Sequence, residues 1–263
     1  MELLTNKRIV IKVGTSSLTY ATGQLDRRHI DVLTSVICDL KNMGNEVVLV
    51  SSGASGVGMG KLGLRRKPAE SAKRRVLAAS GQSGLMAMYE EFFGRYNCRI
   101  AQVLLTKSSL FDKNNYKSIT ASFEEMFAYG VLPIVNENDV IASDEPGSDD
   151  VFGDNDSLSA SVAAFIHADL LIIWSDIDGL YDKDPRTHAD AKFVPVVHGV
   201  TNEIYEMAGA AGTARGTGGM VTKLNAAKIA NAAGCDMIIT NSAKPELLYD
   251  LAEGFPIGTL FKA

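Results

Sequence analysis

The architecture of this 263-residue chain is set near its N-terminus by Arg8-Ile9-Val10-Ile11-Lys12-Val13-Gly14-Thr15-Ser16-Ser17. The first six residues are mostly apolar, which predicts a short strand buried in a sheet, and the last four form a small polar loop. Asp26 then fits the N-cap of a helix, and Gly44 fits its C-terminal stop. Residues 47–50 predict a second strand, which runs into the small polar turn 51–56. The stretch therefore predicts a strand-helix-strand unit with a loop suited to a ligand after each strand.

Strand and helix patterns alternate along the rest of the chain. Because alternation of this kind is typical of a mainly parallel sheet with helices on both faces, we predict an α/β fold, a three-layer α-β-α sandwich in one domain, residues 1–263. In such sheets ligands bind beyond the carboxyl ends of the strands, so the polar segments after residues 13, 50, 135 and 174 should gather at one edge. Further strands are expected at residues 99–105, 132–135, 169–174, 236–240 and 259–261, and helices at 70–96 with a break at Gly81, 153–166, 202–207, 224–233 and 245–253.

Composition narrows the classes of function. The net charge is −5, which argues against a nucleic-acid-binding surface. No apolar run approaches the ~20 residues of a membrane span, and residues 1–7 lack a signal-peptide core, so we expect a cytoplasmic protein without a membrane partner. The three cysteines have no metal-ligand spacing, and the four histidines are scattered. No metal centre and no Ser-His or Cys-His catalytic group is therefore expected.

The segment Gly216-Thr217-Gly218-Gly219-Met220-Val221-Thr222-Lys223 predicts a phosphate site. Glycines let the backbone approach a ligand closely, and a lysine where a helix begins adds its charge to the free N–H donors of the helix N-terminus. The alternative is a flexible glycine-rich loop. The position of Lys223 and the hydroxyls of Thr217 and Thr222 favour the phosphate site, although no P-loop string occurs.

Lys12 is a second candidate for a functional cation, because it lies in an otherwise apolar strand. Burying an unpaired charge is costly, so either Lys12 reaches solvent at a sheet edge or it has an anionic partner. That partner could be a ligand phosphate or a carboxylate such as Asp156. Asp154 and Asp156 lie at a predicted helix start, where they could serve only as an N-cap and a favourable first-turn acid.

Asn136, Asn138 and Asp139 follow the strand predicted at residues 132–135. They could hold a small polar substrate, with Asp139 binding an amino group, or they could form an ordinary turn rich in Asn and Asp. The missing nucleophile suits phosphoryl transfer, in which the protein mainly positions groups and neutralises charge. A carboxylate acceptor with a pKa near ~4 would need no general base at neutral pH.

Seven segments, in this order, resemble the amino-acid kinase superfamily, and most closely its members that phosphorylate glutamate. The resemblance implies ATP-dependent phosphorylation of the γ-carboxylate of L-glutamate to γ-glutamyl phosphate, the first step of proline biosynthesis. A related acceptor such as acetylglutamate, aspartate or UMP is one alternative, and a non-catalytic nucleotide- or amino-acid-sensing module is another. The matching segments are residues 11–16, 51–54, 79–83, 135–139, 153–160, 176–181 and 216–223.

The resemblance also implies a role for each motif residue. Lys12 and Lys223 would neutralise charge on the transferring phosphoryl group, with Asp156 orienting both. Residues 1–165 would carry the amino-acid site and residues 166–263 the ATP site, and Mg²⁺ would accompany the nucleotide without a protein ligand that we can name. Glutamate would be bound by Ser52, Gly53, Asn138, Asp139 and Asn155, and ATP by Lys12, Ser175, Asp176, Thr217, Gly218, Gly219, Met220 and Lys223.

Partners and regulation come from the resemblance as well. It implies a homo-oligomer, either a dimer or a tetramer, and feedback inhibition by L-proline through the glutamate site. Many members continue into a C-terminal domain that resembles RNA-binding modules, and we expect this chain to represent a form without it. Ser175 and Ser157 stand where threonine and asparagine are expected in some relatives, so nucleotide contacts should differ in detail.

Overall fold

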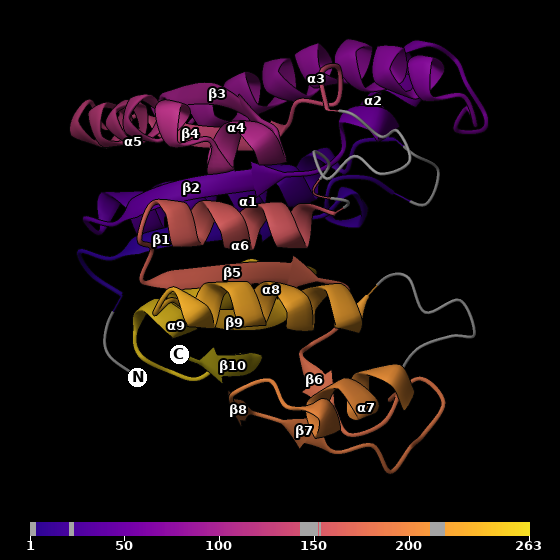
Figure 1. Ribbon diagram of the computed structural model, residues 1–263, viewed down its shortest axis with the longest axis vertical. Helices are drawn as coiled ribbons and strands as arrows, with labels where there is room; N and C mark the ends of the chain where they lie inside the picture. Colours follow the sequence, from indigo (N-terminus) through magenta and orange to yellow (C-terminus); the bar gives the residue numbers. More distant parts are fainter. Residues whose placement is uncertain (1–3, 21–23, 143–151, 153, 211–218) are drawn as a thin grey trace.

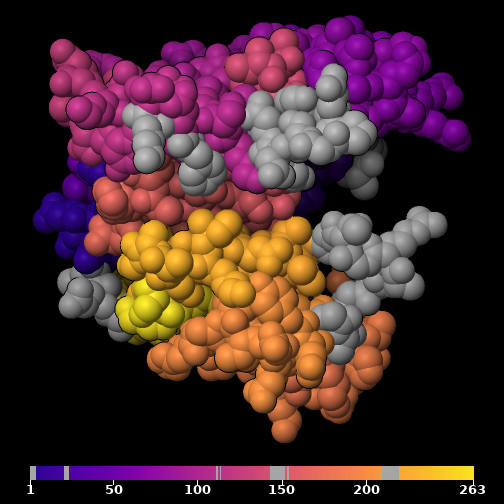
Figure 2. Space-filling model, in the orientation of Figure 1, coloured from indigo at the N-terminus to yellow at the C-terminus, as the bar shows by residue number. Residues whose placement is uncertain are grey.

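The structure is a computed structural model that describes residues 4–20, 24–142, 152, 154–210 and 219–263. Figure 1 shows a central sheet with helices on both faces, which confirms the predicted three-layer α/β architecture. Figure 2 shows the purple and magenta part of the chain at one end of the molecule and the orange part at the other, with the indigo and yellow residues between them. Among the described helices, none is long and apolar enough to cross a membrane.

The described strands of the main sheet follow the order β3-β4-β2-β1-β5-β9-β10-β8. Neighbours pair in parallel except β9 with β10, so β10 and β8 run against the other strands of this sheet. A separate antiparallel pair joins β6 (Leu180–Tyr181) and β7 (Phe193–Val194). The bounds of the main strands are β1 (Arg8–Val13), β2 (Glu46–Ser51), β3 (Ile100–Leu105), β4 (Leu132–Glu137), β5 (Leu170–Ser175), β8 (Val196–His198), β9 (Asp236–Asn241) and β10 (Thr259–Lys262).

The helices cover the two faces of the sheet and enclose two apolar cores. One core contains side chains of α1, α3 and α9, and the other contains side chains of α4, α5, α6 and α8. A 3₁₀ turn, Thr15–Ser17, follows β1. The helix bounds are α1 (Arg27–Asn42), α2 (Ala54–Lys61), α3 (Ser71–Gly94), α4 (Lys107–Phe111), α5 (Lys113–Ala128), α6 (Asn155–Phe165), α7 (Asn202–Ala210), α8 (Met220–Ala232) and α9 (Leu247–Ala252).

The alternation of side chains along β1 places Lys12. Ile9 and Ile11 belong to the first core, whereas Val10 belongs to the core that contains side chains of α6 and α8. Because successive residues of a strand point to opposite faces of the sheet, Lys12 lies on the same face as Val10. The side chain of Lys12, on a central strand, therefore points toward α6 and α8, the two helices that carry Asp156 and Lys223.

The strand order brings the polar segments together. β4, β2, β1 and β5 are consecutive neighbours in the sheet and all pair in parallel, so their carboxyl ends lie along one edge. The segments after residues 13, 50, 135 and 174 therefore converge, as the sequence predicted. One backbone hydrogen bond ties two of them directly, because Ser52 N donates to Val13 O over 3.0 Å.

The predicted break at Gly81 is wrong, because α3 is continuous through this residue. A Cβ at Gly81 would lie 1.7 Å from Ala54 O, and one at Gly58 would lie 2.0 Å from Leu77 O. The two glycines thus allow α2 and α3 to pack backbone against backbone. The glycine-rich composition of residues 54–61 also concealed α2, for which the sequence predicted only a turn, since glycine disfavours an isolated helix.

Candidate active site

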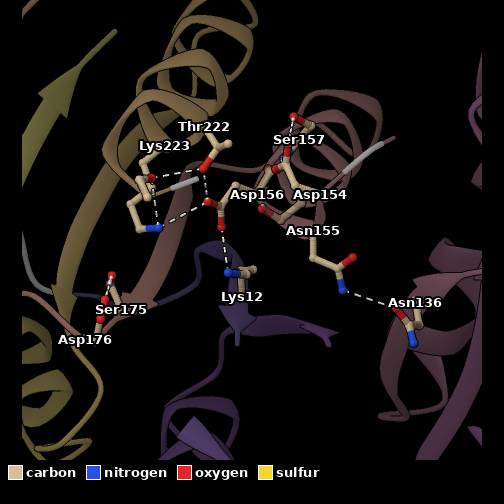
Figure 3. Close-up of polar contacts among 12 residues, drawn as sticks. Lys12, Asn136, Asp154, Asn155, Asp156, Ser157, Ser175, Asp176, Thr222 and Lys223 are labelled. Atoms are coloured by element: carbon tan, nitrogen blue, oxygen red, sulfur yellow. Dashed lines mark hydrogen bonds and ion pairs between the residues drawn. The ribbon is translucent and has the colours of Figure 1, made fainter. Parts of the chain in front are cut away.

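Asp156 is the centre of the site, and two lysines contact it. Lys12 Nζ lies 2.6 Å from Asp156 Oδ1, and Lys223 Nζ lies 3.2 Å from Oδ2. Thr222 Oγ1 donates to the same Oδ2 over 2.9 Å. Figure 3 shows the carboxylate between the two ammonium groups. The structure therefore brings together Lys12, Asp156 and Lys223, the residues that the sequence predicted to act as one unit.

The start of α6 positions Asp156. Asp154 is the N-cap residue, and its carboxylate accepts from Ser157 N over 2.8 Å and from Ser157 Oγ over 3.1 Å. Asp156 lies in the first turn of the helix, where a negative charge interacts favourably with the helix dipole. Of the two acids that the sequence placed here, Asp154 thus caps the helix and Asp156 faces the lysines.

The start of α8 positions Lys223. Gly219 is the N-cap residue with φ of 107°, a left-handed value that favours glycine. Its carbonyl accepts from Thr222 Oγ1 over 3.0 Å and from Lys223 Nζ over 3.3 Å. The helix begins at Met220, so Lys223 lies within the first turn and not at its first residue. Gly216, Thr217 and Gly218 of the predicted phosphate loop lie outside the described residues.

Among the described residues that contact one another at this centre, two lysines share the single carboxylate of Asp156. Asp156 is 4% exposed and Lys223 is 8% exposed. Burial raises the pKa of Asp156, but attraction to Lys12 and Lys223 outweighs burial, so its pKa lies below the ordinary value of a carboxyl. One ionised carboxylate balances only one of two ammonium groups. The remaining positive charge in a largely buried site favours an anionic ligand.

A second polar group lies beside this centre, on the side of β4. Asn155 Nδ2 donates to Asn136 Oδ1 over 3.2 Å, and Asn136 Nδ2 donates to Gln82 Oε1 over 2.9 Å. Asn155 adjoins Asp156 in sequence, so the amides continue the lysine-carboxylate centre outward (Figure 3). The sequence predicted Asn155 as a site residue and noted Asn136, but it gave Gln82 no role beyond its place in the matching segment 79–83. A polar residue between the buried Leu77 and Leu85 of α3 was the available signal.

The other residues predicted for the amino-acid substrate follow β2 and β4. Ser52 and Gly53 form the turn before α2, and Gly53 has φ of 108°. Asn138 and Asp139 follow Glu137, the last residue of β4, and Asn138 N donates to Leu105 O over 2.8 Å. Burial raises the pKa of Asp139, and the nearby Lys67 offsets part of that effect. The ammonium group of a bound amino acid would lower the pKa of Asp139 further.

The residues predicted for ATP at the end of β5 lie on the other side of the lysines. Ser175 is buried, and its Oγ donates to Asp176 Oδ1 over 3.2 Å. Ser175 O accepts from Ser242 N over 2.7 Å, which ties the end of β5 to the end of β9. In the view of Figure 3, Ser175 and Asp176 lie toward Lys223 and Asn136 lies on the opposite side of Lys12. The residues predicted for ATP and the amide group of Asn136 thus lie on different sides of Lys12 in this view.

The described residues offer no preformed metal site, since no group of three or more His, Cys, Asp or Glu side chains among them could hold an ion. The central carboxylate is engaged by two lysines and by Thr222. Asp156 is therefore poorly suited to binding a cation. The protein part of the site fits an anion better than a metal ion.

Residues 7–241 match the amino acid kinase family, and the chain belongs to that family. It is 52% identical over 258 residues to a protein of Clostridium perfringens (strain 13 / Type A) named glutamate 5-kinase, and the match covers 98% of this chain and 96% of that relative. A glutamate 5-kinase of Thermoanaerobacter sp. (strain X514) is 48% identical over 254 residues, which cover 97% of this chain and 67% of the relative.

Among solved structures, the fold is similar to that of a carbamate kinase from Giardia lamblia bound to AMP-PNP. The TM-score is 0.70 at 19% sequence identity, and the match covers 99% of each chain. At this identity the likeness shows the fold alone. It agrees with the parallel sheet and the flanking helices of Figure 1.

Proposed function

We propose that this chain transfers the γ-phosphoryl group of ATP to the γ-carboxylate of L-glutamate, forming γ-glutamyl phosphate and ADP. The observation that carries the proposal is the pair Lys12 and Lys223 on opposite oxygens of Asp156. Relatives named glutamate 5-kinase, 48% and 52% identical to this chain, support glutamate as the acceptor. The reaction is the first step of proline biosynthesis.

The two lysines act on the charge of the transferring group. A γ-carboxylate oxygen attacks the γ-phosphorus, the bond from that phosphorus to the β,γ-bridging oxygen breaks, and the electron pair leaves on ADP. Negative charge spreads over the phosphoryl oxygens during transfer, and positioned cations stabilise it. Lys12 and Lys223 supply these cations, and Asp156 holds both in place. The acceptor carboxylate is already ionised at neutral pH, so no general base is required.

The two substrates approach the lysines from opposite sides. Ser52, Gly53, Asn138, Asp139 and Asn155 bind glutamate within residues 1–165, and the carboxylate of Asp139 pairs with its α-ammonium group. Residues 166–263 bind ATP through Ser175, Asp176, Gly219, Met220 and Lys223 and through Thr217 and Gly218, which lie outside the described residues. The separation of Asn155 and Ser175 about the lysines supports this assignment (Figure 3).

Mg²⁺ bound to the nucleotide would supply charge neutralisation at its phosphates. The described side chains do not form a site for it. No step assigned to the protein depends on the ion.

Three further properties complete the proposal. L-proline inhibits by competing at the glutamate site, because it shares the α-carboxylate and the α-nitrogen of the substrate. The chain forms a homo-oligomer, and it works in the cytoplasm, where glutamate and ATP are both available.

Coupled measurement of ADP release with a panel of acceptors tests the proposal. Glutamate should support turnover far better than aspartate, N-acetylglutamate or UMP. Preference for UMP or N-acetylglutamate would assign a different acceptor to the same site. Ligand binding without ADP release from any acceptor would assign a sensing role.

A further inference from the structure

Gln82 lies at the middle of α3 and has no role in the reaction described above. Its side chain ends a row of three hydrogen-bonded amides that come from three separate elements. Asn155 of α6 donates to Asn136 of β4 over 3.2 Å, and Asn136 donates to Gln82 over 2.9 Å. The row starts at the residue next to Asp156 and leads away from the phosphoryl-transfer centre.

One backbone group orients all three amides. Glu137 N donates to Asn136 Oδ1 over 2.9 Å, so this side-chain atom must be the oxygen. Asn136 Nδ2 is then the donor toward Gln82, which must accept through Oε1. Asn155 must likewise donate through Nδ2. The row therefore leaves an acceptor, Asn155 Oδ1, at one end and a donor, Gln82 Nε2, at the other.

The donor end of the row lacks a partner. Gln82 Nε2 is inaccessible to solvent and makes no hydrogen bond to any part of the chain that the structure describes. A buried donor without an acceptor is costly, and native structures seldom retain one without a reason. An acceptor supplied by a ligand would remove the cost.

The neighbourhood of Gln82 is that of the proposed amino-acid substrate. The preceding residue, Gly81, packs against the backbone of Ala54, and Ala54 directly follows the turn Ser52-Gly53. The lysines meet the γ-carboxylate end of glutamate, and Asp139 meets its ammonium group. The α-carboxylate is the one charged group of the substrate that still lacks a partner, and it is an acceptor.

We propose that Gln82 donates from Nε2 to the α-carboxylate of the bound amino acid and selects substrates that carry this carboxylate. The inference rests on the proposed function, because it takes glutamate as the acceptor. Lys67 is the competing partner for the α-carboxylate, because its charge acts on Asp139.

The contact between Gln82 Nε2 and the α-carboxylate can be tested by a substitution that turns the hydrogen-bond donor into an acceptor. Gln82→Glu keeps the oxygen that accepts from Asn136 and replaces the donor with a carboxylate oxygen. Glutamate should then be repelled, and its α-amide, L-isoglutamine, should gain a donor for the new oxygen. Gln102→Glu is the matched control, because it makes the same charge change at an exposed position of β3.

The measured quantity is kcat/KM for glutamate divided by kcat/KM for L-isoglutamine. Gln82→Glu should lower this ratio roughly 100-fold or more relative to the wild type, since a hydrogen bond to a charged group is replaced by repulsion. The KM for ATP should stay within about 3-fold, and Gln102→Glu should leave the ratio unchanged. Glutamate KM should recover in part at lower pH, where the introduced carboxyl is protonated and donates again.

Several results would overturn the contact. If folded Gln82→Glu protein has the wild-type ratio, Gln82 does not contact the α-carboxylate. If kcat/KM falls equally for glutamate and isoglutamine, the role of Gln82 is structural. If Lys67→Ala lowers the ratio and Gln82→Glu does not, the α-carboxylate binds Lys67 instead. If Gln82→Glu does not fold, Gln82→Met removes the amide at similar length and should lower the ratio roughly 10-fold. Wild-type protein without glutamate turnover would instead reject the proposed function.

Discussion

Lys12 of β1 and Lys223 of α8 contact opposite oxygens of one carboxylate, that of Asp156, at 2.6 Å and 3.2 Å. This arrangement holds two ammonium groups close together against their mutual repulsion. Within this group of three described residues, one positive charge is in excess, beside the candidate sites for two substrates. The predictions that follow depend on this geometry and on the segments that support it.

Replacing Lys223 with alanine should lower kcat by at least ~10²-fold, the typical loss when one charge-stabilising group is removed. Lys228→Ala is the control, because Lys228 lies on the same helix but is exposed. Steady-state kinetics with glutamate and ATP would check the prediction. A much smaller loss in a folded variant would remove Lys223 from the catalytic group.

Replacing Asp156 with asparagine should destabilise the protein by about 3–5 kcal/mol, because it leaves two largely buried lysines without a counter-charge. Urea unfolding would measure the change. Asp190→Asn removes an exposed ion pair with Lys183 and should leave the free energy of unfolding nearly unchanged. Equal effects of the two substitutions would contradict the structural role of Asp156.

The same residue predicts a dependence of stability on pH. The folded-state pKa of Asp156 is lowered, so the carboxylate stabilises the fold fully above its unfolded pKa of about 3.9 and loses this contribution as pH falls through the lower folded value. The gap in unfolding free energy between wild type and Asp156→Asn should therefore be constant near neutrality and narrow below about pH 4. Urea titrations across this range would test it, and a gap that widened on acidification would have the wrong sign.

The environment of Asp139 predicts that a proton is released when the substrate binds. Burial raises the pKa of Asp139, and a bound ammonium group should lower it again, so glutamate binding should release a proton at pH values above the ordinary carboxyl pKa of ~3.9. Calorimetry in buffers of different ionisation enthalpy would detect the release. Asp139→Asn should abolish it and raise KM for glutamate more than it lowers kcat. Unaltered proton release in Asp139→Asn would place the ammonium group elsewhere.

Gly81→Ala should disturb the glutamate side of the site through the helix contact. The new Cβ would meet Ala54 O at 1.7 Å, so α2 must move, at a cost of about 1–3 kcal/mol or more. Since Ala54 follows Gly53, the glutamate KM should rise as well. Gly94→Ala on the same helix meets no atom within 4 Å and should be neutral or stabilising. Thermal unfolding and the glutamate KM of both variants would test this, and equal values for Gly81→Ala and Gly94→Ala would contradict the prediction.

Local chemistry in the sequence accounts for most of the architecture. The apolar run of β1, the N-caps Asp26 and Asp154 and the strand-helix alternation were all predictable, because strand periodicity and capping depend on residues a few positions apart. The convergence of the polar segments followed from the parallel sheet. The pairing of Lys12 with Asp156 was one of the alternatives that the sequence left open.

The features that the sequence did not predict depend on contacts between segments that are distant along the chain. Asp156 and not Asp154 faces the lysines because of the rotation of α6 about its cap. Gln82 of α3 and Asn136 of β4 are 54 positions apart and meet only in the folded chain. β10 pairs antiparallel to β9, although the last strand carries no local mark of its direction. The sequence thus determined most of the elements, although it missed α2 and placed a break at Gly81 within the continuous helix α3. Their crossing and packing, set by burial across the whole chain, decided which side chains share a site.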